Sequence, residues 1–451
     1  MIAKNKFNEI RYFLTWKFSF GKKRKHYKQK YKNIVQLNFL SDVCQKNIEK
    51  LKNKLRKKIQ KTQKISVYFV AYEKAQWGLG SVFEAMKNDP VFEPKVFVCR
   101  AWERENVEAN PTQDLIEFFE KQNMEVVLEL DENQLPDVIF SARYDFDYIK
   151  FNYDIKKLYK KSLLCYFSYP WIVEGQEKRV YDVFYNANEM KFFWKEFMPD
   201  INSFESTKNG PTKGKNVILS GHPKGDEIYR VDKKCEHWKN NDTKKIIYAP
   251  HWSIYNSIYA KSCFERYYVN FLNYLTEHPE IEIILKPHPM LRKLIYDKDI
   301  QKTWNATPNI TPEEYEEFIN KWCNLPNANI VDDGNYFNLF ATSDAMILDS
   351  LSFTAEYMLL NKPMCWCSKQ DTEEEFRKYF NRMGNDLLNA IEIAFSWEDI
   401  VSFIEETVVK GNDRNDNLRL EMIDKHLSVN KGQVGEFIKN HIKEELIYKE
   451  E

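Results

Sequence analysis

The sequence lacks any long apolar run. No stretch of about 18 consecutive apolar residues occurs, so we expect no segment that spans a bilayer. The N-terminal residues carry charges but no apolar run of the length found in secretory signals, so no secretory signal is expected. Internal repeats and low-complexity linkers are also missing, which argues against a solenoid or a disordered chain. These absences predict a protein of the cytoplasm.

Paired cysteines are missing as well. None of the eight cysteines forms a CxxC motif, and the closest two are Cys365 and Cys367 in an apolar run. On a strand these two side chains lie on one face, with no second pair at the spacing of a metal site. We interpret the cysteines as buried reduced thiols, which are typical of a reducing compartment. The DxD pair Asp145 and Asp147 stands apart from the motifs below, so neither a metal nor another cofactor is expected.

The chain has no net charge, but its charges are unevenly distributed. It contains 67 basic and 67 acidic residues, yet residues 1–64 hold twenty lysines and arginines against three acidic residues. The rest of the chain is therefore acidic by the same margin. This asymmetry indicates that the basic N-terminal segment is a separate functional zone.

The basic segment has two parts. Residues 1–32 mix aromatic side chains with basic clusters, and residues 36–63 carry apolar side chains at helical spacing with lysines on the other face. Three interpretations compete: a helix that holds the protein on an anionic membrane surface, a helix that docks on a partner, and a nucleic-acid binder. We favour peripheral association with the inner face of the cell membrane. Nucleic acid is not expected as a partner, because the following segments carry no RNA or DNA motif.

Beyond Ile65, apolar strands alternate with helices in two successive series. The strands are continuous apolar runs, which is typical of parallel sheets buried on both faces. We therefore predict an α/β fold with two Rossmann-like domains facing a cleft. The expected divisions are an acceptor domain over 65–219, a nucleotide-donor domain over 220–405 and a helical tail over 406–451, after the helical membrane-association segment 1–64.

Histidines follow two of the strands expected in the second domain. His251 and Trp252 come after the strand that starts near Lys244, and Lys286 and His288 follow the next strand. Ligands bind at the carboxyl ends of strands in doubly wound sheets. A loop histidine is more often a plain surface residue, but several at successive strand ends favour a site. We expect His251, Trp252 and Lys286 to bind the donor. We expect His288 to be catalytic, as a hydrogen-bond donor to developing charge or as a general acid or base.

The stretch from Asp349 to Glu356 joins a buried strand to a helix. Asp349 ends the strand, and Ser350 and Ser352 lie where the helix begins. Free amides and the helix dipole attract phosphate at such a point, although the serines are equally suited to simple helix capping. A carboxylate next to a bound phosphate would repel it, so Glu356, one turn along, is assigned to the ribose hydroxyls of the donor.

Four segments, in order, resemble motifs of a known family. They are residues 220–226 (SGHPKGD), 248–253 (YAPHWS), 286–289 (KPHP) and 341–363 (ATSDAMILDSLSFTAEYMLLNKP). The chain resembles the CDP-glycerol glycerophosphotransferase family, the teichoic-acid primases and polymerases of the GT-B fold. The resemblance is close from Ser220 to about Cys367, and it covers the first half only in its pattern.

The resemblance implies a transferase of cell-surface polysaccharide biosynthesis. Such an enzyme transfers a polyol phosphate from a CDP-linked polyol to a hydroxyl of a lipid-linked or glycan acceptor and releases CMP. The segment 220–226 would form the hinge between the domains, through Gly221, His222, Pro223 and Asp226.

The sequence departs from the family pattern on the acceptor side. The family's WHGTPLK motif carries a histidine thought to be the base, but the equivalent segment here, residues 165–175, contains none. Tyr169 or Glu174 is expected to replace it. Ser253 also stands where the family has arginine.

Two alternatives stay open, and the missing histidine favours the first. One is a nucleotide-sugar glycosyltransferase of the same fold, acting in lipopolysaccharide or capsule assembly. The other is a non-catalytic scaffold docked at the membrane.

Overall fold

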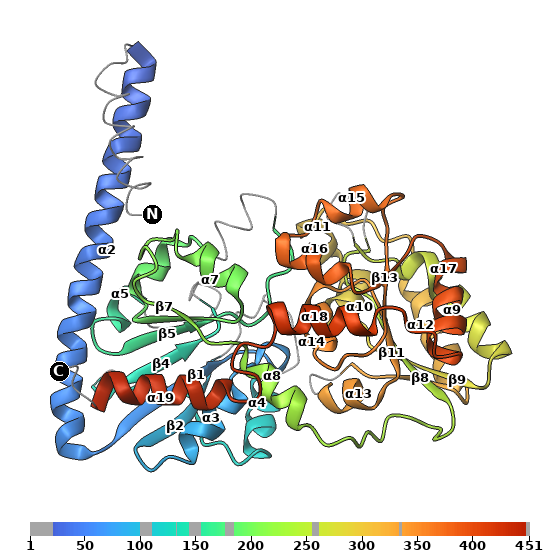
Figure 1. Cartoon of the computed structure of the whole chain (residues 1–451), viewed down its shortest axis with the longest axis horizontal. Helices are drawn as coiled ribbons and strands as arrows, with labels where there is room; N and C mark the ends of the chain where they lie inside the picture. The colour runs from blue at the N-terminus through green and yellow to red at the C-terminus, as the bar shows by residue number, and fades with distance from the viewer. Residues whose placement is uncertain are drawn as a thin grey trace.

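The computed structural model describes residues 21–99, 111–131, 133–143, 155–175, 185–254, 261–332 and 336–447. Asp145 and Asp147 lie outside these residues. In the described part of the chain, no helix is both long and apolar enough to cross a membrane. Two parallel sheets, each flanked by helices, lie side by side (Figure 1). We call the first sheet with its helices the first half and the second sheet with its helices the second half.

The first half is built on a seven-stranded parallel sheet with strand order β3-β2-β1-β4-β5-β6-β7. Several of its strands, such as β1, β4 and β5, are apolar runs buried on both faces, as the sequence predicts. Their bounds are β1 Ile65–Ala71, β2 Phe92–Val98, β3 Val126–Val127, β4 Val138–Ser141, β5 Leu163–Phe167, β6 Lys195–Met198 and β7 Val217–Leu219. The helices are α2 Gly21–Thr62, α3 Gly80–Lys87, α4 Pro111–Glu120, α5 Ile155–Leu158 and α7 Ile201–Thr207, with 3₁₀ turns at Lys74–Gln76 and Asn188–Phe192.

The second half repeats the design with a six-stranded parallel sheet of order β10-β9-β8-β11-β12-β13. Its strands are β8 Lys244–Ala249, β9 Ile281–Leu285, β10 Ala328–Ile330, β11 Ala345–Leu348, β12 Met364–Cys367 and β13 Glu392–Ala394. Its helices are α8 Pro223–Arg230, α9 Phe264–Glu277, α10 Pro289–Tyr296, α11 Lys298–Thr303, α12 Pro312–Asn324, α13 Phe337–Thr342, α14 Leu351–Met358, α15 Glu373–Arg377, α16 Arg382–Leu388, α17 Trp397–Ser402 and α18 Asp416–His426, with a π-helical turn at Phe403–Val409. The predicted fold of two Rossmann-like domains is confirmed.

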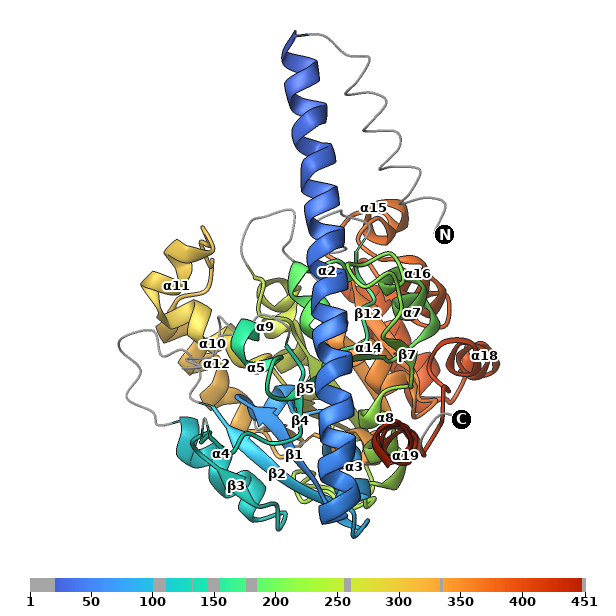
Figure 2. The ribbon, with the colours of Figure 1, turned by 90° about the vertical axis from the view of Figure 1, so that its left-hand side faces the viewer.

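Helix α2 belongs partly to the first half. It begins at Gly21, earlier than the sequence suggests, and its N-terminal part extends away from both sheets (Figures 1 and 2). Its C-terminal part is packed: Ile48 and Ile59 are 1% and 2% exposed within the first core. From Cys44 to Ile59, the predicted apolar face therefore packs in the protein's own first core. The part of the basic segment that stands apart from the core ends near residue 40.

The C-terminal helix α19, Val434–Ile447, returns to the first half. Its apolar face is fully buried in the first core, through Ile438, Ile442 and Leu446. Both backbone N–H groups at its start, on Val434 and Gly435, donate to the carboxylate of Asp226 at 3.1 and 2.8 Å. Helix α19 thus returns the C-terminal part of the chain to the first half (Figure 1).

Candidate functional site

The strand-end residues expected to act together do lie together in the second half. Strands β8, β9 and β11 are neighbours in the sheet, so their carboxyl ends meet at one edge. The rings of His251 and His288 are 5.4 Å apart between centroids. Trp252 lies beside both rings and packs edge-on against Trp304 at 5.0 Å.

His288 begins helix α10 and has one ring nitrogen engaged. It is the N-cap residue, and its Nδ1 accepts a hydrogen bond from the backbone N–H of Met290 at 3.1 Å. Burial, helped by the nearby charge of Lys286, lowers the pKa of His288 to about 4. The ring is therefore neutral at pH 7 with its proton on Nε2, and among the described residues Nε2 has no hydrogen-bond partner. The geometry suits donation to an anionic ligand better than proton abstraction.

His251 is a second neutral imidazole. Its Nδ1 lies 2.7 Å from the Ser253 hydroxyl and accepts from the Ser253 backbone N–H at 3.3 Å. Burial first, and then the proximity of His288 and Lys261, hold its pKa well below the usual range. With Nδ1 accepting, the proton again resides on Nε2. Ser253, which replaces the family arginine, thus fixes the tautomer of the adjacent histidine.

Asp349 organises this edge of the sheet instead of pointing into solvent. It is fully buried, and its two carboxylate oxygens accept hydrogen bonds from the backbone N–H groups of His251 and Cys263. Burial raises its pKa to about 7 against the opposing effect of these hydrogen bonds. Asp349 therefore holds the loop after β8 and the start of α9 in place.

Helix α14 begins at this edge without a side-chain cap. Ser350 is its N-cap residue and is 5% exposed, but its hydroxyl makes no capping hydrogen bond. The side chain of Ser352 lies outside the described part of the chain. In the first half, by contrast, the side chain of Glu227 lies against the start of α3. A Cβ built on Gly80, the first residue of that helix, would stand 2.7 Å from Oε1 of Glu227. Of these two helix starts, that of α14 is thus the one suited to a phosphate.

Glu356 is already engaged by neighbouring side chains. Its Oε1 accepts from Nζ of Lys224 at 2.8 Å and its Oε2 accepts from the hydroxyl of Tyr336 at 2.5 Å. All three side chains are buried, and Nζ of Lys286 lies 5.8 Å above the Tyr336 ring. The sequence placed Lys224 within the segment 220–226 but gave it no role, and it did not single out Tyr336, since a tyrosine before a helix carries no recognisable motif.

The predicted hinge segment is tightly packed. Gly221 has a φ of +82°, and a Cβ there would stand 2.1 Å from the carbonyl oxygen of Val429. His222 caps α8 by accepting from the Lys224 backbone N–H at 3.2 Å. Its Nε2 donates to the carbonyl of Tyr169 at 3.0 Å, and its ring stacks on Trp171 at 3.9 Å. Pro223 follows as the first helical residue.

The segment after β5 crosses to the second half. Trp171 and Val173 pack in a core of the second half. Asn381 binds this segment by donating to the carbonyls of Ile172 and Glu174 at 2.5 and 3.3 Å. The carboxylate of Glu174 forms an ion pair with Lys261. This segment, which stands where the family histidine is missing, therefore bridges the two halves.

The first half carries a group that the sequence did not reveal. Tyr72, Arg143 and Tyr169 follow the adjacent strands β1, β4 and β5, and the Arg143 guanidinium lies 5.6 Å above the Tyr72 ring. Burial raises the pKa of Tyr169 despite the nearby charge of Arg143, so its hydroxyl stays protonated at neutral pH. Only the register of the strands places these three residues at one edge.

In the described part of the chain, no three histidine, cysteine or carboxylate side chains cluster as metal ligands do. Potential cationic and N–H donors to a phosphate are instead Lys286, His251, His288 and the start of α14.

Comparison with known families gives one match, to CDP-glycerol:poly(glycerophosphate) glycerophosphotransferase. It spans residues 200–444, more than half of the 451 residues. This range includes all the strand-end residues described for the second half. No curated protein sequence is similar enough to this chain to count as a relative.

Solved structures share the fold at low sequence identity. A variant of the wall teichoic acid polymerase TagF with CDPG is 16% identical with a TM-score of 0.53, and the match covers 91% of this chain and 98% of that one. UDP-GlcNAc 2-epimerase from Neisseria meningitidis bound to UDP-GlcNAc is 12% identical with a TM-score of 0.53, covering 84% and 99%. S. aureus MnaA with UDP is 12% identical with a TM-score of 0.52, covering 86% and 99%. At such identities these likenesses establish the fold alone.

Proposed function

Since the chain belongs to the CDP-glycerol:poly(glycerophosphate) glycerophosphotransferase family, we propose that it transfers a polyol phosphate from a CDP-linked polyol to an acceptor hydroxyl. One structural observation carries the proposal: two neutral histidines lie beside the uncapped start of α14 at one sheet edge. Such an arrangement offers N–H donors to a pyrophosphate without a carboxylate pointing at it.

In the proposed reaction the acceptor oxygen attacks the β-phosphorus of the donor. A new P–O bond forms, the bond between this phosphorus and the bridging oxygen breaks, and CMP leaves with that oxygen. Nε2–H of His288 and of His251 would donate to the phosphate oxygens as charge develops on them. Asp349 acts through the loops that it holds, so we propose a positioning role for it. Glu356 lies deeper. A ribose hydroxyl could bind it only if Glu356 accepted this hydrogen bond in addition to those from Lys224 and Tyr336.

The acceptor proton must pass to a base. Tyr169 is a poor candidate because its pKa is raised by burial. We propose Glu174, a carboxylate at the bridge between the halves, whose ion pair with Lys261 brings it beside the loop of His251. Glu174→Gln is expected to lower turnover about a hundredfold while leaving nucleotide affinity unchanged. A loss of affinity instead would show that Glu174 only holds the halves together.

The donor class is the first thing to test. Nucleotide release would be measured with CDP-glycerol, other CDP-polyols and UDP-sugars, each with a hydroxyl-bearing acceptor. We expect CMP from a CDP-polyol. The missing WHG histidine favours one alternative, a nucleotide-sugar glycosyltransferase, which would release a nucleoside diphosphate. A protein that binds and turns over none of these donors would instead be a scaffold.

We further propose that the reaction needs no metal, because lysine and imidazole N–H groups already surround the phosphate position. Turnover should then be unchanged by EDTA. Restoration of lost turnover by a divalent cation would refute this.

We propose that the protein works at the inner, cytoplasmic face of the cell membrane, on a lipid-linked or glycan acceptor. The basic N-terminal part of α2, which extends away from both sheets, supports this location (Figure 1). Removing residues 1–40 should release the protein from anionic vesicles in a salt-sensitive manner and preserve nucleotide binding. Removing residues 1–64 should damage the fold as well, since Ile48 and Ile59 lie in the first core.

A further inference from the structure

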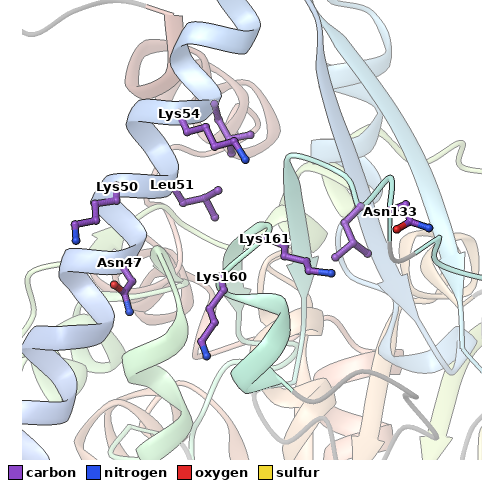
Figure 3. Close-up of a pocket in the computed structure, with 9 residues that line it drawn as sticks. Asn47, Lys50, Leu51, Lys54, Asn133, Lys160 and Lys161 are labelled. Carbon is purple, nitrogen blue, oxygen red and sulfur yellow. The ribbon is translucent and has the colours of Figure 1, made fainter.

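A pocket of about 700 Å³ lies between helix α2 and the first sheet (Figure 3). Its residues are distant in sequence from those proposed to bind the donor. Its lining comes from α2 and from two segments of the first half, and consists of Asn47, Lys50, Leu51, Lys54, Leu55, Asn133, Leu135, Lys160 and Lys161.

The charge of this pocket has one sign. Lys50 and Lys54 come from α2 and Lys160 and Lys161 from the turn after α5, and the lining contains no carboxylate. All four lysines are exposed. Four lysines in the lining of one pocket raise the local concentration of anions and favour a ligand with negative charge.

The base of the pocket is apolar. Leu51 and Leu55 are 8% and 7% exposed and belong to the first core, and Leu135 packs partly buried against it. An anion that also carries an apolar portion would therefore fit better than a small inorganic anion, which gains nothing from leucine side chains.

The pocket is separate from the transfer site. Asn133 and Leu135 precede β4, and Lys160 and Lys161 precede β5, so they lie at the amino ends of these parallel strands. Tyr72, Arg143 and Tyr169 lie at the opposite, carboxyl ends, and the donor residues belong to the second half. A ligand in this pocket is thus neither the donor nor the reacting end of the acceptor.

We propose that this pocket binds the phosphodiester head of an anionic phospholipid. The four lysines would hold the phosphate, and the first acyl carbons would rest on the leucines. The same helix supplies half of the cationic rim and continues into a segment with seven lysines and arginines between residues 22 and 32, which suits a flat anionic surface. The proposal rests on the peripheral location proposed above and adds a specific headgroup site to it.

The test compares two full-length variants that remove four charges each. The pocket variant is Lys50→Gln, Lys54→Gln, Lys160→Gln and Lys161→Gln. The control variant is Lys46→Gln, Lys57→Gln, Lys156→Gln and Lys157→Gln, which removes exposed lysines of α2 and α5 outside the pocket lining. Partition onto phosphatidylglycerol vesicles and phosphatidylcholine vesicles would be measured by sedimentation, with thermal melts to confirm that both variants fold.

We expect the pocket variant to bind phosphatidylglycerol vesicles at least tenfold more weakly than the control variant, with unchanged turnover on a soluble acceptor. Equal losses in the two variants would overturn the pocket and leave the peripheral location standing. Failure of the wild-type protein to bind anionic vesicles would overturn both the pocket and the peripheral location. Displacement of the protein from vesicles by millimolar soluble glycerol phosphate would show that the leucines contribute nothing to binding. That result would overturn the lipid as the ligand.

Discussion

Two histidines start helices in this protein in the same manner and differ at their other ring nitrogen. His222 and His288 both precede a proline, and each accepts a backbone hydrogen bond at Nδ1. Nε2 of His222 is used within the protein, on the carbonyl of Tyr169. Nε2 of His288 has no hydrogen-bond partner among the described residues. These two HP dipeptides look alike in the sequence, so only the structure separates the hinge residue from the proposed phosphate ligand.

Substitution of His288 can separate its two roles. His288→Asn keeps a good N-cap, so we expect a stability close to that of the wild type, but it loses Nε2–H and should turn over about a hundredfold more slowly. His288→Ala should be equally slow and less stable by about 1 kcal/mol. Steady-state turnover and thermal melts check both. Wild-type turnover in the asparagine variant would reduce His288 to a helix cap.

Ser350 offers a similar test at the start of α14. Because its hydroxyl makes no capping hydrogen bond, Ser350→Ala should change stability little but weaken binding of CDP or CMP about tenfold. Thr311→Ala is a matched control, since Thr311 does cap helix α12 and should lose about 1 kcal/mol of stability without loss of affinity. Calorimetric titration alongside melts distinguishes the two. Unchanged affinity in Ser350→Ala would show that the phosphate does not bind at this helix start.

Glu196 predicts a pH dependence of stability. It is fully buried in β6, and burial raises its pKa to about 8 although Asn216 and Thr212 donate to it. An unfolded glutamate titrates near pH 4.3. The folded state therefore holds the Glu196 proton more tightly than the unfolded state does. Its contribution to the free energy of unfolding is fully present below about pH 4 and is lost as the pH rises towards 8.

Glu196→Gln mimics the protonated side chain and should be more stable than the wild type, by a margin that grows from pH 5 to pH 8 to a few kcal/mol. Urea unfolding of both proteins at the two pH values measures the margin. A margin that does not change with pH would mean that Glu196 is ionised in the folded protein.

At the scale of the elements, strand β6 shows what the sequence conceals. Its residues, KEFM, include two charges, so no strand was expected there, yet all four are buried. Lys195 is tolerated because it forms an ion pair with Glu445 of α19, and Glu196 is tolerated because it is protonated at neutral pH. Strands with continuous apolar runs, such as β1 and β11, were predictable because both faces of a parallel sheet are buried.

Helix α19 depends on a cap from another element. Asp226 of α8 accepts both N–H groups at its start, so Asp226→Ala should cost about 1–2 kcal/mol and speed amide hydrogen exchange within α19. Asp226→Asn keeps one acceptor and should lose less. Unchanged exchange in α19 for the alanine variant would contradict the contact that joins the hinge to the tail.

At the scale of the whole molecule, each half contributes a segment to the other. Trp171 and Val173 pack in a core of the second half, and α19 packs in the core of the first. Neither exchange was predictable, because local apolar patterns identify a buried face but not the surface that covers it. The same limit applies to α2, whose apolar face was expected to bind a membrane or a partner and in fact covers the first sheet.

The proposed donor site was more accessible to sequence reasoning than the proposed acceptor site. Residues at the carboxyl ends of β8, β9 and β11 follow their strands directly, so their gathering at one edge could be foreseen. Their partners could not: both oxygens of Asp349 bind backbone N–H groups, and Glu356 binds Lys224 and Tyr336 from distant parts of the chain. Side-chain partners depend on tertiary packing, which periodicity does not report.

We propose that this protein forms a phosphodiester at the expense of a CDP-linked polyol. ³¹P NMR of the wild-type protein with CDP-glycerol and a hydroxyl-bearing glycan or lipid-linked acceptor would detect that product. We predict one new phosphodiester resonance for each CMP released, and neither product with His288→Asn on the same time scale. Release of CMP together with free glycerol phosphate, or a phosphate-free glycosidic product formed from a UDP-sugar, would contradict the account.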